Sequence, residues 1–89
     1  MKNNEVDGRV QGAKPLPKWV MYKYAKLWKN FQQREFDYSE ALEIVDENTS
    51  VVINFLKKRR WMTVALHPED SRKRLYRLRT PQQVIGEIE

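Results

Sequence analysis

The chain has 89 residues, of which 40% are hydrophobic and 33% are charged, and it carries a formal net charge of +5. A chain of this length has room for one domain, and its composition is that of a globular protein. Because it contains no cysteine, disulfide scaffolds, cysteine zinc sites and thiol nucleophiles are excluded. The single histidine, His67, excludes a histidine-rich metal site, and we expect neither a metal nor a cofactor.

Neither a membrane span nor a secretory signal is visible in the sequence. No apolar run approaches the ~18 residues that a transmembrane helix needs. The first residues have mixed charge and lack the apolar stretch of a signal peptide. We therefore expect a cytoplasmic protein that has no membrane partner and no evident small-molecule ligand.

The charges are unevenly distributed along the chain. Residues 18–34 carry five basic and no acidic side chains, and residues 35–47 carry six acidic and no basic ones. Residues 57–79 carry nine basic side chains against two acidic ones. Such a basic surplus permits nucleic acid, an acidic protein or an anionic membrane as a partner, so the place of these residues in the fold matters.

The first expected element is a tail, followed by a helix. Residues 1–16 show no apolar period and predict a flexible tail before a domain at 17–89. Pro17 suits the first turn of a helix, where its missing N–H has no role. Five apolar residues then recur at helical spacing: Val20, Tyr24, Leu27, Trp28 and Phe31. This pattern predicts a helix over 17–33.

Two shorter helices are expected next. Asp37 and Glu40 form the pattern of a capping box, which predicts a helix over about 38–45. After a turn, Asn48 or Thr49 is expected to cap a third helix that ends near Arg59. One face of this third helix is apolar, and the opposite face is first polar and then basic, with Ser50, Asn54, Lys57 and Lys58.

The apolar period changes after Arg60 from about 3.6 residues to 2, which indicates strands. A first strand is expected at 61–66, a turn at 67–71 and a second strand at 73–79, giving a hairpin with a loop of about six residues. Thr80 and Gln83 form a second capping box, with Pro81 at the first helical position, and predict a final short helix.

This order of elements predicts an α+β fold, a winged helix-turn-helix with three helices, a β-hairpin wing and a short C-terminal helix. The second helix of such a unit enters the major groove of DNA, which is about 12 Å wide. We therefore expect one DNA-binding set on the third helix and the hairpin tip: Thr49, Ser50, Asn54, Lys57, Lys58, Arg72, Lys73 and Arg74. Most aromatic residues stand at helical spacing and are assigned to the core instead of base stacking: Trp19, Trp28, Trp61, Phe31, Phe55 and Tyr24.

Residues 52–58 and 67–78 resemble the recognition helix and wing of winged-helix regulators, and the pair Asp70 and Arg72 resembles the Asp-x-Arg wing of the MarR-like group. The resemblance implies that Arg72 contacts DNA and that Asp70 holds the wing in shape. Two features depart from it, since Arg60 stands where the family usually has glycine and the long dimerising helices are missing. The chain is also similar to winged-helix domains of archaeal proteins, some fused to nucleotidyltransferase-type domains.

We therefore expect a sequence-specific double-stranded DNA-binding protein, a small transcriptional regulator, and not an enzyme. The sequence has no catalytic triad pattern and no glycine-rich phosphate loop. A homodimer is expected because regulators usually read two half-sites, and the first helix with residues 81–89 is the candidate dimer surface. The alternatives are a protein-interaction module on the same fold, through the first or the acidic second helix, and RNA binding.

Overall fold

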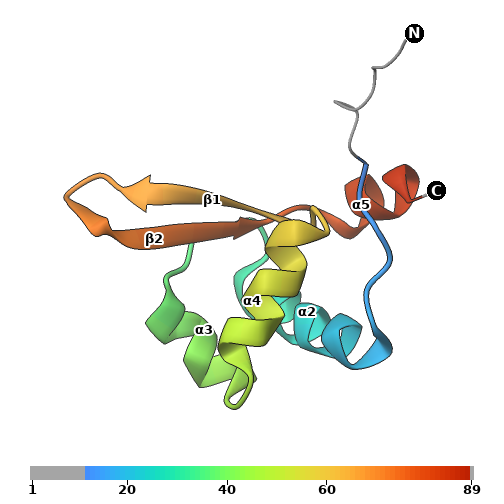
Figure 1. Ribbon diagram of the computed structural model, residues 1–89, viewed down its shortest axis with the longest axis horizontal. Helices are drawn as coiled ribbons and strands as arrows, with labels where there is room; N and C mark the ends of the chain where they lie inside the picture. Colours follow the sequence, from blue (N-terminus) through green and yellow to red (C-terminus); the bar gives the residue numbers. More distant parts are fainter. Residues whose placement is uncertain (1–11, 89) are drawn as a thin grey trace, which may run out of the picture.

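The computed structural model of the chain describes residues 12–88. In chain order it contains α2 (Lys18–Phe31), α3 (Tyr38–Val45), α4 (Thr49–Lys58), β1 (Met62–His67), β2 (Asp70–Leu78) and α5 (Pro81–Glu87). Figure 1 shows α2, α3 and α4 gathered below the base of the hairpin, whose tip extends past them, while α5 follows β2 at that same base. This arrangement confirms the expected α+β fold, and its topology is compatible with a winged helix.

Local signals account for the start and end of the first two helices. The carbonyl of Pro17 accepts hydrogen bonds from the first turn of α2, and the helix ends where Gln32 takes a positive φ of 52°. The expected capping box of α3 is present, since Asp37 accepts from the Glu40 N–H at 2.9 Å and Glu40 accepts from the Asp37 N–H at 3.0 Å. Both helices lie within two residues of their predicted bounds.

The cap of α4 differs from the prediction. Asn48 precedes the helix in the left-handed region with φ 66°, and its side chain makes no capping hydrogen bond. The Thr49 hydroxyl donates to the carbonyl of Asp46 at 2.6 Å and accepts from no helix N–H among the described residues. The tight turn between α3 and α4 therefore uses positive φ at Asp46 and Asn48, where asparagine and aspartate are the best-tolerated residues after glycine.

The hairpin is longer and its turn is tighter than the sequence predicts. The antiparallel register pairs Met62 with Leu78 at the base and His67 with Asp70 at the tip, with an irregularity between Leu66 and His67. Only two residues separate the last pair, so the predicted loop of about six residues is wrong. The pair of His67 with Asp70 closes the tip, while Ser71, Arg72 and Lys73 have no partner in the register and form a bulge in β2.

Phe36 joins the segment between α2 and α3 to the wing. Its N–H donates to the Tyr76 carbonyl at 2.9 Å, and the Tyr76 N–H donates back at 2.8 Å, which forms an isolated antiparallel bridge. The Phe36 ring is fully buried and stacks on Phe31 with the ring centroids 4.4 Å apart. This one-residue bridge fixes the base of the hairpin to the helices, and no strand pattern around Phe36 predicts it.

The core lies between the three helices and the base of the hairpin. Its largest fully buried side chains are Trp61, Phe36, Leu27, Leu56, Leu78, Val20, Val45, Val52 and Val84. The Trp61 ring packs edge-on against Tyr24 at 4.9 Å, and the Tyr24 hydroxyl donates to the Arg79 carbonyl at 2.7 Å. The core assignment of the aromatic residues fails only at Trp19, which is 41% exposed at the start of α2.

Residues 12–16 lie against this core, and residues 1–11 of the expected tail lie outside the described part of the chain. The Lys14 carbonyl accepts from the Trp61 indole N–H at 2.7 Å, and the Lys14 N–H donates to the Arg59 carbonyl at 3.0 Å. A Cβ on Gly12 would lie 2.7 Å from the Glu87 carbonyl oxygen, so only glycine fits this close approach. We refer to residues 12–16 as the N-terminal strap.

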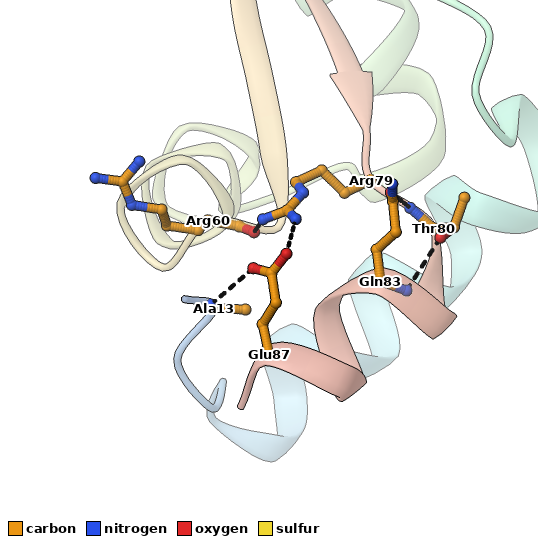
Figure 2. Close-up of polar contacts among 6 residues, drawn as sticks. All are labelled: Ala13, Arg60, Arg79, Thr80, Gln83 and Glu87. Carbon is orange, nitrogen blue, oxygen red and sulfur yellow. Dashed lines mark hydrogen bonds and ion pairs between the residues drawn. The ribbon is translucent and has the colours of Figure 1, made fainter. Parts of the chain in front are cut away.

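Glu87 connects the strap to the base of the hairpin, where the chain enters β1 and leaves β2 (Figure 2). Its carboxylate accepts from the Ala13 N–H at 3.2 Å and pairs with the Arg79 guanidinium, which also donates to the Arg60 carbonyl at 2.9 Å. The hydrogen bond from Arg79 is the main reason why the pKa of Glu87 lies below its ordinary value. Arg60 takes a positive φ of 68°, so its backbone adopts the conformation that glycine accepts best.

Candidate nucleic-acid interface

The outer face of α4 carries four of the residues expected to contact DNA. Ser50, Asn54, Lys57 and Lys58 are all exposed, and their spacing sets them on one side of the helix. The opposite side holds Val52, Ile53 and Leu56 in the core. The helix therefore presents small polar groups near its start and two cations in its last turn.

Thr49 does not belong to this face. Its side chain is only 2% exposed, and its hydroxyl is used by the carbonyl of Asp46. Val51 does belong to it, with 45% exposure next to Ser50. On a helical wheel of α4, Thr49 falls on the buried side, while Val51 falls at the edge of the exposed side, one turn before Phe55 and two turns before Lys58. The spacing of the residues could therefore have predicted both positions.

The hairpin tip carries the other expected residues. Arg72, Lys73 and Arg74 are exposed, and the Arg72 side chain is 89% exposed. The Arg72 Nε donates to Asp70 at 3.3 Å, while its two terminal nitrogens have no acceptor among residues 12–88. Arg74 makes one long hydrogen bond, of 3.4 Å, to the carbonyl of Ser71. The tip thus presents three cationic side chains to solvent.

Asp70 fixes the start of β2. Its Oδ1 accepts from the backbone N–H of Arg72 at 3.0 Å as well as from the Arg72 side chain. These two hydrogen bonds, the backbone one first, hold the pKa of Asp70 below its ordinary value, and the nearby charges of Lys73 and His67 act in the same direction. An ionised carboxylate at this position stabilises the turn and offsets part of the Arg72 charge, while the two terminal nitrogens of Arg72 still have N–H groups to donate.

The two arginines at the base of the hairpin are paired within the chain. Arg77 lies 3.3 Å from the carboxylate of Glu35, and Arg79 pairs with Glu87. The base of the hairpin is therefore close to neutral, whereas its tip keeps its positive charge. This division concentrates the basic surplus of residues 57–79 at the end of α4 and at the tip of the wing.

A hydrogen bond connects α4 with the start of α3. The Tyr38 hydroxyl and the Ser50 hydroxyl lie 3.0 Å apart, and both residues are exposed. Tyr38 also lines a hollow whose other wall is the strand segment Arg72–Arg74. The polar face of α4 and the cationic tip are consequently parts of one continuous surface.

A second aromatic and cationic cluster lies beside the end of α4. Trp19 packs edge-on against Phe55 at 6.2 Å, and the guanidinium of Arg59 lies 5.3 Å from the centre of the Phe55 ring. Arg59 also donates to the Pro15 carbonyl at 2.6 Å. These contacts hold the strap against α4, so we assign Arg59 to the fold and not to the interface.

The acidic residues of α3 lie mainly away from this surface. Glu40 pairs with Arg34 at 3.4 Å and also takes part in the capping box, while Glu43 lines a separate hollow with Lys26 and Lys29 of α2.

No helix within residues 12–88 is long and apolar enough to cross a membrane. The chain matches no known family model, no curated protein and no solved structure.

Proposed function

We propose that this chain is a sequence-specific double-stranded DNA-binding protein of the winged helix-turn-helix type, a transcriptional regulator with a MarR-like wing. The observation that carries the proposal is the continuous surface formed by the polar face of α4 and the cationic hairpin tip. A helix fits the major groove, which is about 12 Å wide, and phosphates attract the cations on both sides of it.

The first half of α4 supplies the groups that read bases. Asn54 offers an amide that can donate to and accept from the same adenine edge, and the Ser50 hydroxyl can serve either base of a pair. The exposed methyl groups of Val51 suit contact with a thymine methyl group. Lys57 and Lys58 follow one turn later and contact phosphates, which set the register of the helix in the groove.

The wing supplies contacts that do not depend on base identity. Arg72, Lys73 and Arg74 are exposed at the tip, where they meet backbone phosphates or the adjacent minor groove. Asp70 acts on the DNA only through Arg72, because the two hydrogen bonds that its carboxylate accepts within residues 12–88 both come from that residue. The wing therefore contributes affinity and the helix contributes specificity.

The direct test is fluorescence anisotropy on fluorescent duplexes, first with random sequence at two salt concentrations and then with the site selected from a randomised library. Asn54→Ala is expected to weaken binding by about 1–3 kcal/mol at one base position and to leave other positions unchanged. The matched control is Asn30→Ala, since Asn30 is exposed on α2 and donates only to Lys26 within its own helix. An equal loss on every duplex would contradict base reading.

One observation favours a second candidate function, a protein-interaction module. A groove between α2 and α5 is lined almost wholly by apolar atoms, including Met21, Trp28 and Ile85, and Ile85 is 61% exposed. The same groove is the candidate contact of the expected homodimer. No duplex binding at low salt, together with a shift in sedimentation on Ile85→Lys, would favour this second function. Stronger competition by structured RNA than by duplex DNA would indicate RNA binding.

A further inference from the structure

A hollow separates the first turn of α3 from strand β2. It is lined by residues of these two elements and by Asp37, the N-cap of α3: Asp37, Tyr38, Ser39, Arg72, Lys73, Arg74 and Tyr76. Tyr76 is 8% exposed and closes the floor, while Ser39, Lys73 and Arg74 are exposed at the rim. The hollow lies between the two parts of the proposed interface, because Tyr38 on its wall also bonds Ser50 of α4.

The charges around the hollow favour an anion. Three cations line it against one carboxylate, that of Asp37, which gives a net charge of +2. The Asp37 carboxylate accepts the Glu40 N–H, so it is held toward the helix backbone. Arg72 is shared with Asp70, and the positive charge that remains available comes mainly from Lys73 and Arg74.

The first turn of α3 adds hydrogen-bond donors. An α-helix leaves its first N–H groups without acceptors inside the helix. The capping box satisfies the N–H groups of Asp37 and Glu40, while those of Tyr38 and Ser39 have no acceptor in the part of the chain that the structure describes. The hollow therefore combines two cations, two backbone donors and the Ser39 hydroxyl, which is the donor set of a phosphate site.

We infer that this hollow binds one backbone phosphate of the duplex, held between Ser39 on α3 and Lys73 and Arg74 on the wing. The inference rests on the proposed function and adds a DNA contact from α3, a helix whose acidic residues lie mainly away from the proposed interface. The strand that passes from the groove at α4 to the tip of the wing crosses the hollow. Its phosphate fixes the angle between the DNA axis and the wing.

The test uses two variants that create the same residue at equivalent positions. Ser39 and Gln82 are both exposed and both occupy the second position of a helix, α3 and α5 respectively. Ser39→Glu and Gln82→Glu each add one negative charge to a first turn, where the helix dipole favours it. Neither substitution should lower the thermal midpoint. Only Ser39→Glu sets the new charge against the phosphate.

Ser39→Glu is expected to weaken duplex binding about tenfold at low salt. It should also reduce the slope of log K against log salt by about 0.9, the value for one lost phosphate contact. Gln82→Glu should change neither quantity, because Gln82 does not line the groove between α2 and α5 that is the candidate dimer contact. Equal binding by the two variants would overturn the phosphate site and leave the proposed function intact, whereas no duplex binding by the unmodified chain would overturn both.

A second pair of variants decides the matter if Ser39→Glu folds poorly. Lys73→Gln removes a cation from the rim, and Lys26→Gln removes one from the exposed side of α2. We expect the salt slope to fall by about 0.9 for Lys73→Gln alone. In the double variant of Lys73→Gln with Ser39→Ala, which adds no charge to α3, the two losses should not add, since both act on the same phosphate. Full additivity would contradict a shared site.

Discussion

The N-terminal strap should be coupled energetically to the core through one hydrogen bond, that from the Trp61 indole to the Lys14 carbonyl at 2.7 Å. Trp61 is 1% exposed, so its N–H has no access to water as long as the fold is intact. The perturbation is Trp61→Phe, made both in the full chain and in a shortened chain that lacks residues 1–16. The four proteins form a double-mutant cycle.

The magnitude follows from what each protein loses. In the full chain, Trp61→Phe removes the ring volume and a hydrogen bond worth about 1 kcal/mol net. In the shortened chain the indole N–H has already lost that acceptor, and the space left by the strap admits water to it, so Trp61→Phe loses little hydrogen-bond energy there. The volume term is common to both backgrounds and cancels, which leaves a coupling of about 1 kcal/mol.

The assay is urea unfolding followed by circular dichroism at 222 nm, because the tryptophan fluorescence itself changes with the substitution. The matched control is Trp28→Phe in the same two backgrounds. Trp28 is half-buried against Tyr24, and its indole N–H has no acceptor within residues 12–88. Its coupling to the strap should stay below about 0.5 kcal/mol, the limit for independent sites. A Trp61 coupling that small would refute the role of the strap.

Three further predictions concern pH. Burial raises the pKa of Tyr24 to about 12 from an ordinary value of 10.0, so its stabilisation is full below pH 10 and is lost as pH rises toward 12. The full shift corresponds to about 2.7 kcal/mol, which partial solvation reduces to about 1–2 kcal/mol, and Tyr24→Phe should abolish this alkaline loss in urea midpoints. Because the pKa of Glu87 is lowered in the folded chain, its ionised carboxylate stabilises the fold when pH is above 4.5, the ordinary pKa, and this stabilisation is lost as pH falls. In Glu87→Gln the thermal midpoint should therefore fall less steeply with decreasing pH. The pKa of Asp70, measured by carbon NMR, should rise in Arg72→Gln but stay below its ordinary value, because the backbone N–H of Arg72 remains; a full return would assign the shift to the side chain.

Much of the fold is predictable because its signals are local. The capping boxes at Asp37 and Thr80 each involve two residues three positions apart, and both are present as expected. The Phe36–Tyr76 bridge was not predictable, because one residue with no strand pattern pairs with a partner forty positions away. The strap was missed for the same reason, since its contacts with Trp61 depend on the finished packing.

In the candidate interface, too, the features set by local sequence were predictable and those set by tertiary packing were not. The helical period correctly set Ser50 and Asn54 on the exposed side of α4, because burial of the opposite apolar stripe fixes the rotation of the helix. Thr49 was assigned to that side from its position at the helix start alone, and the turn from Asp46 directs it inward. The hollow beside Ser39 arises where the start of α3 lies close to β2, and no pattern in the sequence predicts how close these two elements are.

The Phe36–Tyr76 bridge anchors the hairpin at its base only, and this has a consequence for how the wing can vary. Beyond Tyr76 the strands pair with each other and leave the core untouched, so two residues can be inserted in each strand without repacking the helices. Insertions of two residues keep each side chain on its face of the hairpin and would lengthen it by about 6.6 Å. Successive phosphates of one DNA strand are separated by about 3.4 Å along the axis, so such an insertion would advance the arginines by about two nucleotides.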